Sequence, residues 1–153
     1  MVARKFGVLV AEDHGGVREV LEMRLRWRGF EVWLAPDGEV ALQVYQQHRE
    51  VIDVVLLDVD IPVLSGPRTL AVMRTLTPDI AGCLMSGRRR AYSPDDLRRA
   101  GAAKFFAKPL TRTESRTSMT PTKSVPGAFE MRGASGRKMI APTNLRVIGH
   151  AFV

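Results

Sequence analysis

The chain has 153 residues, of which 45% are hydrophobic and 25% charged, and its formal net charge is +7. This composition excludes a wholly disordered or collagen-like chain, and no apolar run approaches the roughly 18 residues of a membrane span. The single cysteine, Cys83, excludes an intramolecular disulfide and favours a reducing, cytoplasmic setting.

Short apolar runs alternate with amphipathic stretches as far as residue 107. The predicted strands are Phe6–Ala11, Phe30–Ala35, Asp53–Val59, Ile80–Met85 and Lys104–Ala107. The predicted helices are Gly15–Arg28, a helix capped by Asp37 that reaches His48, Gly66–Leu76, and a helix opened by Ser93 and ended by Gly101. Because the connections are short, this alternation predicts an α/β fold: an open, doubly wound, five-stranded parallel sheet with helices on both faces.

The C-terminal part of the chain has a different character. Residues 112–153 contain seven Lys and Arg but only two Asp and Glu, whereas residues 1–111 are nearly balanced, with 16 and 14. Residues 111–127 show no apolar period and contain two prolines, a pattern typical of a linker or of disorder. Apolar residues return in Met139–Val153, where Leu145–Val153 is compatible with a short strand. We therefore expect a globular domain over residues 1–111 and a basic tail over residues 112–153.

Polar residues follow four of the predicted strands. Glu12 and Asp13 follow the first, Asp58 ends the third, Ser86 follows the fourth and Lys108 the fifth. Ligands of open α/β sheets bind at the carboxyl ends of the strands, so these groups are expected to converge. Clustered carboxylates repel one another unless a cation neutralises them, and an incomplete set of hard oxygen ligands suits Mg2+.

This set of groups is suited to phosphoryl chemistry. A carboxylate beside a metal can act as a nucleophile towards a phosphoryl group, while a lysine and a hydroxyl hold the phosphoryl oxygens. Taken singly, each residue has an ordinary structural interpretation, such as a loop-capping acid or a solvated lysine. Their joint placement at one sheet edge favours the functional interpretation.

Four stretches carry a resemblance to a known family: VLVAEDHGGVREVLEMRLRWRGFEV, DVVLLDVDIPVLSG, CLMSG and GAAKFFAKPL. In their order and spacing over about residues 6–110, they resemble the receiver domain of bacterial two-component response regulators. The resemblance implies a flavodoxin-like, CheY-like sheet with strand order 2-1-3-4-5. It also implies a phosphoprotein of a signal-transducing phosphorelay.

The resemblance assigns the acidic residues their roles. Asp58 matches the aspartate that accepts a phosphoryl group, as an aspartyl phosphate, from a sensor histidine kinase or a phosphotransfer protein. Asp13 matches the main metal-binding acid, Glu12 is its acidic neighbour, and the backbone carbonyl of Asp60 falls where the family supplies a further contact to Mg2+. Asp58 also belongs to this metal-binding set.

The remaining motif residues match the groups that sense the phosphoryl group. Lys108 matches the lysine that pairs with it, and Ser86 matches the switch hydroxyl that bonds one of its oxygens. Phe105 matches the switch aromatic, and Pro109 follows the lysine at a peptide bond that is usually cis in the family. The family's fifth helix has no counterpart in the pattern of residues 111–127, so this helix is expected to be missing or atypical.

Two alternatives to the receiver bear on function. Asp58-Val59-Asp60 also resembles the nucleophile motif of haloacid-dehalogenase-type phosphatases, but the additional acids lie at the wrong places along the chain. The basic tail raises a nucleic-acid-binding module, yet it has no helix-turn-helix, zinc or aromatic-basic pattern, so only weak, non-specific binding is expected. The receiver interpretation predicts a protein that assists its own phosphorylation without being a conventional enzyme. A homodimer is a further expected partner, and a membrane is not.

Overall fold

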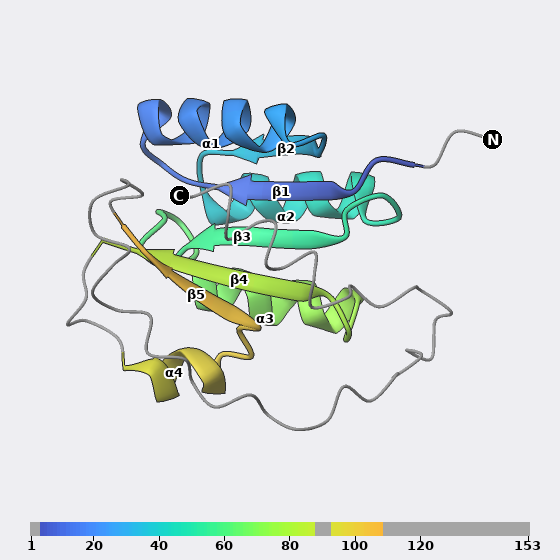
Figure 1. Cartoon of the computed structure of the whole chain (residues 1–153). Helices are drawn as coiled ribbons and strands as arrows, with labels where there is room; N and C mark the ends of the chain where they lie inside the picture. Colours follow the sequence, from blue (N-terminus) through green and yellow to red (C-terminus); the bar gives the residue numbers. More distant parts are fainter. Residues whose placement is uncertain (1–3, 88–92, 109–153) are drawn as a thin grey trace, which may run out of the picture.

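The computed structural model describes residues 4–87 and 93–108. Its strands are β1 (Gly7–Ala11), β2 (Glu31–Ala35), β3 (Val54–Asp58), β4 (Ala81–Ser86) and β5 (Lys104–Ala107). Its helices are α1 (Gly15–Trp27), α2 (Gly38–His48), α3 (Gly66–Leu76) and α4 (Pro94–Arg99). Figure 1 shows them in the alternating order that the sequence predicts, with boundaries within one or two residues of the expected ones.

The five strands form one parallel sheet in the order β2-β1-β3-β4-β5. This order confirms the flavodoxin-like arrangement. In β1 and β3 every residue is buried, as expected for strands that are covered on both faces and therefore carry continuous apolar runs. Val8 pairs with Val54 and Ala11 with Leu57, so these two central strands end side by side.

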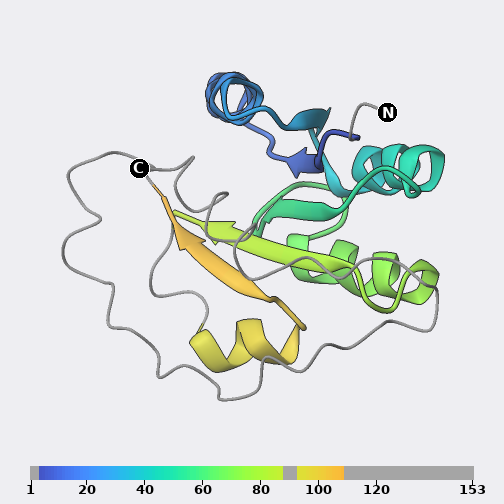
Figure 2. The ribbon, with the colours of Figure 1, turned by 45° about the vertical axis from the view of Figure 1, so that its right-hand side comes forward.

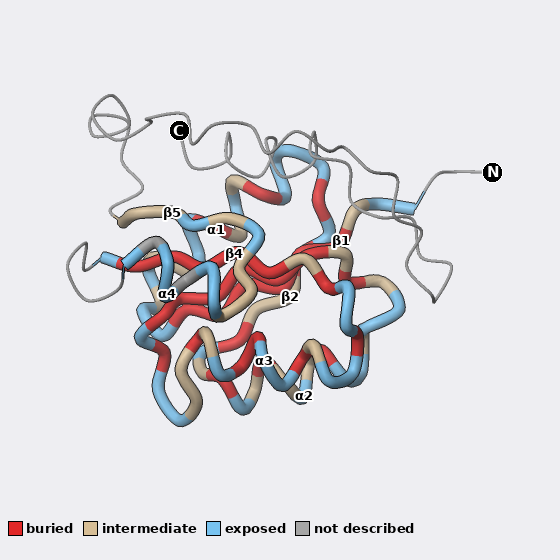
Figure 3. The backbone as a smooth tube through the Cα atoms, turned by 90° about the horizontal axis from the view of Figure 1, so that it is seen from below, coloured by how far each residue is buried: buried red, intermediate tan, exposed pale blue. Residues whose placement is uncertain are grey.

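Side chains alternate between two apolar layers, because successive residues of a strand point to opposite faces. Leu9, Val55 and Leu84 face α2 and α3 in one layer. Val10, Leu56 and Cys83 lie in the other, together with Leu21 and Leu25 of α1. Figure 2 shows α1 on one side of the sheet and α2 and α3 on the other, and Figure 3 shows the buried strands between them.

Local capping fixes where the helices begin. Asp37 accepts a hydrogen bond from the backbone N–H of Val40 at 2.8 Å, and Ser93 and Asp96 form a reciprocal capping box at the start of α4. Gly29, past the end of α1, has φ +89°, a conformation that glycine adopts without steric cost. The caps that the sequence predicts at Asp37 and Ser93 are therefore confirmed.

Two further findings concern the whole chain. Among the residues that the structure describes, no helix has the length and apolar composition needed to cross a membrane. Pro109, the expectation about a fifth helix and the expected strand in Leu145–Val153 all lie outside the described residues.

Candidate functional site

The carboxyl ends of β1 and β3 bring three carboxylates together. The backbone N–H of Glu12 donates to the carbonyl of Ala35 at 3.0 Å, which continues the β1–β2 pairing by one residue. Glu12 and Asp58 are buried, at 1% and 5% exposure, whereas Asp13 is exposed. One carboxylate oxygen from each of the three lies within 4.8 Å of the other two. The convergence predicted from the strand ends is therefore present.

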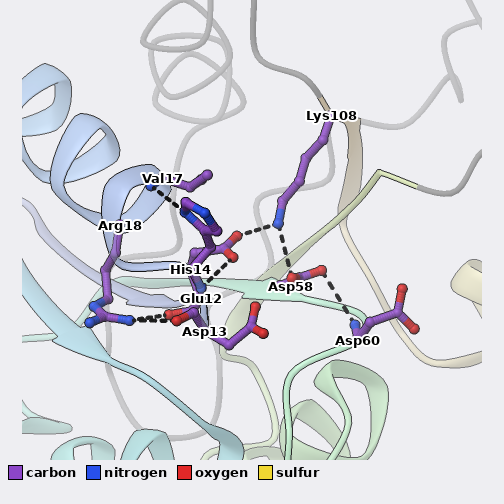
Figure 4. A network of polar contacts seen from close by, with 8 residues as sticks. All are labelled: Glu12, Asp13, His14, Val17, Arg18, Asp58, Asp60 and Lys108. Atoms are coloured by element: carbon purple, nitrogen blue, oxygen red, sulfur yellow. Dashed lines mark hydrogen bonds and ion pairs between the residues drawn. The ribbon is translucent and has the colours of Figure 1, made fainter.

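Lys108 supplies the positive charge of the site. Its backbone N–H donates to the carbonyl of Ser86 at 2.8 Å, which places the residue directly after β5 at the same sheet edge. Its Nζ forms an ion pair with Glu12 Oε2 and another with Asp58 Oδ2 at 2.9 Å. Figure 4 shows the lysine reaching from β5 to both buried carboxylates.

Burial and pairing act against each other in the pKa values of this group. Burial raises the pKa of the Glu12 carboxyl, and the hydrogen bonds from Lys108 and from the His14 backbone offset this only in part. Burial by itself lowers the pKa of the Lys108 ammonium, but hydrogen bonds to Glu12 and Asp58 reverse the effect, so its pKa is raised. Lys108 therefore stays charged at neutral pH.

The donor set fits a divalent cation. Two of the three carboxylates are buried, and among the described residues the one cationic side chain paired with them is Lys108, which does not balance three negative charges. All three offer hard oxygen ligands, with Asp13 on the solvent side, and Mg2+ prefers such an incomplete oxygen set because it keeps part of its water shell. Glu12, Asp13 and Asp58 are the residues that would hold it.

Two residues with no predicted role, Arg18 and His14, support the acidic pair Glu12 and Asp13. Arg18, one turn into α1, donates from Nη1 to the carbonyl of Glu12 at 2.7 Å and to that of Asp13 at 3.2 Å. His14 donates its backbone N–H to Glu12 Oε1 at 3.1 Å, and its Nδ1 accepts from Val17 N–H at 3.4 Å as the cap of α1. The sequence carries no signal for these contacts, because a helix-surface arginine ordinarily faces solvent.

The loop after β3 is held against the start of α3. The backbone N–H of Asp60 donates to Asp58 Oδ1 at 3.3 Å, so Lys108 and this amide contact different oxygens of the same carboxylate. Gly66 N–H donates to the carbonyl of Val59 at 3.0 Å. A Cβ on Gly66 would lie 2.3 Å from the carbonyl oxygen of Asp58, so only glycine permits this approach.

Ser86 and Phe105 occupy the neighbouring strands. Ser86 is the last residue of β4 and is 1% exposed; it pairs with Ala107, while Met85 before it pairs with Asp58. Ser86 therefore lies at the site edge but inside β4, whereas its predicted position was just after the strand. Phe105 pairs with Leu84 and is 38% exposed.

Comparison with known proteins agrees with this architecture. The family model of the response regulator receiver domain matches residues 8–120. The transcriptional regulatory protein PrrA of Mycobacterium tuberculosis is 35% identical over 107 residues, which cover 70% of this chain and 45% of PrrA. ZraR of Salmonella typhimurium is 32% identical over 110 residues, covering 72% of this chain and 24% of ZraR. The chain thus spans less than half the length of these curated relatives.

Solved structures show the same fold. A response regulator receiver domain protein from Clostridium thermocellum superposes with a TM-score of 0.65 and 26% identity, covering 69% of this chain and 84% of that one. The CheX–CheY–BeF3–Mg2+ complex from Borrelia burgdorferi superposes with a TM-score of 0.65 and 29% identity, covering 70% of this chain and 81% of that one. TrrA from Thermotoga maritima, in complex with Mg2+ and BeF, superposes with a TM-score of 0.60 and 27% identity, covering 67% of this chain and 86% of that one.

The sheet order and the acidic edge define a flavodoxin-like protein with a strand-end site for polar ligands. The family match makes the assignment specific: the chain belongs to the response regulator receiver domain family of two-component systems. This decides for the receiver over the haloacid-dehalogenase-type phosphatase. The nucleic-acid alternative depends on residues 112–153, which lie outside the described residues.

Proposed function

We propose that Asp58 accepts a phosphoryl group from a sensor histidine kinase or a phosphotransfer protein. The observation that carries the proposal is the setting of the Asp58 carboxylate. It is buried at the end of the central strand, with Lys108 Nζ at 2.9 Å from one oxygen and the Asp60 N–H at 3.3 Å from the other. In the transfer, the phosphorus–nitrogen bond of a phosphohistidine breaks and a phosphorus–oxygen bond to Asp58 forms.

The other residues of the site act on charge. Asp13, Glu12 and the backbone carbonyl of Asp60, together with Asp58, would hold Mg2+, which would supply positive charge to the carboxylates and to the incoming phosphoryl oxygens. Lys108 moves from its pairing with Glu12 and Asp58 to a phosphoryl oxygen, and Ser86 donates to another. The structures of the Borrelia and Thermotoga proteins with Mg2+ and a beryllium fluoride support this assignment by similarity.

The new charge drives a switch. A phosphoryl group adds about two negative charges and strong acceptor oxygens beside Ser86. The Ser86 hydroxyl turns towards it, and Phe105, already 38% exposed on β5, follows into the vacated space. The chain assists its phosphorylation and dephosphorylation because it supplies the groups that bind the cation and the phosphoryl oxygens. It is not a conventional enzyme, because the side chain that is modified is its own. It acts in the cytoplasm, where the kinase domain of its partner lies.

Incubation with acetyl phosphate and Mg2+, followed by intact-mass measurement, tests the proposal. One phosphoryl group should attach to the native chain and none to Asp58→Asn. Asp60→Asn is the matched control, because it removes a neighbouring carboxylate and keeps the backbone groups that the proposal uses. Equal labelling of Asp58→Asn would refute Asp58 as the acceptor. Loss of labelling in Asp60→Asn would show that the Asp60 side chain takes part in the transfer, contrary to the proposed role of its backbone alone.

A further inference from the structure

Half of one sheet face lacks a covering helix among the described residues. Leu56 of β3, Cys83 and Met85 of β4 and Phe106 of β5 belong to the apolar layer that α1 shares. The residues of α1 in that layer are Val17, Leu21 and Leu25. Figure 1 shows α1 beside β1 and β2, at the end of the sheet away from β4 and β5.

The other described helices lie on the opposite face. Leu70 and Met73 of α3, and Ala100 directly after α4, pack in the layer that contains Leu84. A Cβ on Gly82 would meet the Leu70 side chain, so α3 covers the face of β4 that carries Gly82 and Leu84. Among the side chains that the structure describes, α1 is therefore the only helix that contributes to the layer of Leu56, Cys83 and Met85.

These three side chains are nevertheless fully buried. At the sheet edge, Phe106 is half-buried, with the Lys104 ammonium 5.3 Å from its ring centroid, so this layer continues to β5. An apolar layer of this size requires an apolar cover, since leaving large side chains in water is unfavourable. We name the surface formed by Leu56, Cys83, Met85 and Phe106 the β3–β5 face.

We propose that the β3–β5 face is the docking site of this chain's own C-terminal segment, Met139–Val153. Lys108 lies directly after β5 of the same sheet, and the chain continues for 45 residues beyond it. Nine of the 15 residues of Met139–Val153 are Ala, Val, Ile, Leu, Met or Phe, against six of the 28 residues 111–138, so the apolar cover is concentrated there. The intervening 30 residues span up to roughly 100 Å when extended, which reaches any part of the face. The docking does not depend on phosphorylation.

Covalent attachment favours this segment over a separate molecule. A tethered segment acts at an effective concentration of about a millimolar, which a second copy of the chain does not reach at ordinary protein concentrations. The competing occupant is the same segment of a second copy, which would make a dimer by exchange. The experiment must therefore separate contacts within one chain from contacts between two.

Cys83 is a reporter built into the face, because it is the single cysteine of the chain and is fully buried. Burial raises the pKa of its thiol to about 12, so a protected Cys83 should react slowly with iodoacetamide at pH 8. In the full chain, Leu145→Asp and Ile148→Asp should speed labelling at least about tenfold, because a charged side chain does not remain in an apolar contact. Val125→Asp, an equal change in the polar part of the tail, should leave the rate unchanged.

Labelling rates of both Leu145→Asp and Ile148→Asp within twofold of the native rate would overturn the proposal. Rapid labelling of the native chain would do the same. A second measurement covers the case in which a variant unfolds. Disulfides require Cα atoms within about 7 Å, so mild oxidation of Leu145→Cys or Ile148→Cys should link to Cys83 within one chain, while Val125→Cys should not. Links formed only between chains, or none at any position, would overturn the intramolecular docking.

Discussion

Replacement of Gly66 by alanine should destabilise the domain strongly, although alanine is the better helix former. The added Cβ would lie 2.3 Å from the carbonyl oxygen and 2.9 Å from the carbonyl carbon of Asp58. Both obstacles are backbone atoms at the end of the central strand, so no side-chain rotation relieves the clash. Overpacking of this kind costs about 1–3 kcal/mol or more. The higher helix propensity of alanine offsets at most about 1 kcal/mol of this cost.

A net loss of about 2 kcal/mol is therefore expected for Gly66→Ala, which lowers the melting temperature by about 10 °C in a domain of this size. Thermal and urea unfolding followed by circular dichroism measure it. Gly15→Ala is the matched control, because at that helix start the nearest atom to a new Cβ is Arg18 Nη2 at 3.9 Å. A Gly66→Ala domain as stable as Gly15→Ala would refute the close seating of α3 against Asp58.

Four further outcomes are expected. Asp13→Ala should weaken Mg2+ binding, measured by calorimetry, and acetyl-phosphate labelling together; unchanged Mg2+ affinity would contradict the metal site. Lys108→Gln should lower the free energy of unfolding by about 3 kcal/mol in EDTA, because it leaves two buried carboxylates without the ammonium that neutralises them. Added Mg2+ should restore part of this loss. Val63→Gly should stabilise the domain by about 1 kcal/mol, since Val63 has φ 69°; an unchanged urea midpoint would argue against strain there. The hydrogen bonds from Ser93 lower the pKa of Asp96, so the stability that this acid contributes is present above pH 3.8 and is lost as the pH falls through its folded pKa. The stability difference between the native chain and Ser93→Ala should therefore narrow below about pH 4, and a constant difference from pH 7 to 3 would exclude the capping carboxylate as its cause.

The fold was predictable because local signals agreed with the tertiary structure. Continuous apolar runs in β1 and β3 indicated buried parallel strands, and Asp37 and Ser93 indicated helix starts, each confirmed by a side-chain hydrogen bond. The strand order itself came from the family resemblance, since apolar periodicity does not specify which strands are neighbours.

The site was predictable only at the level of which residues meet. Parallel strands end at one edge, so the convergence of Glu12, Asp58 and Lys108 followed from chain order. The contacts of Arg18 with the carbonyls of Glu12 and Asp13 did not, because they depend on the rotamer of a long side chain. The close approach of Gly66 to Asp58 was also missed, because it depends on how α3 packs against the strand end.

The two central strands and the edge strand differ in burial, and this divides the site by local stability. All residues of β1 and β3 are buried, whereas β5 pairs on one side only within the described part of the chain and keeps Phe105 exposed. Amide protons of central strands exchange through global unfolding, while those of edge strands exchange through smaller local openings. Opening of β5 therefore withdraws Lys108 from Glu12 and Asp58 while both acids stay in place. The cationic and anionic halves of the site consequently have separate lifetimes, which native-state hydrogen exchange resolves strand by strand.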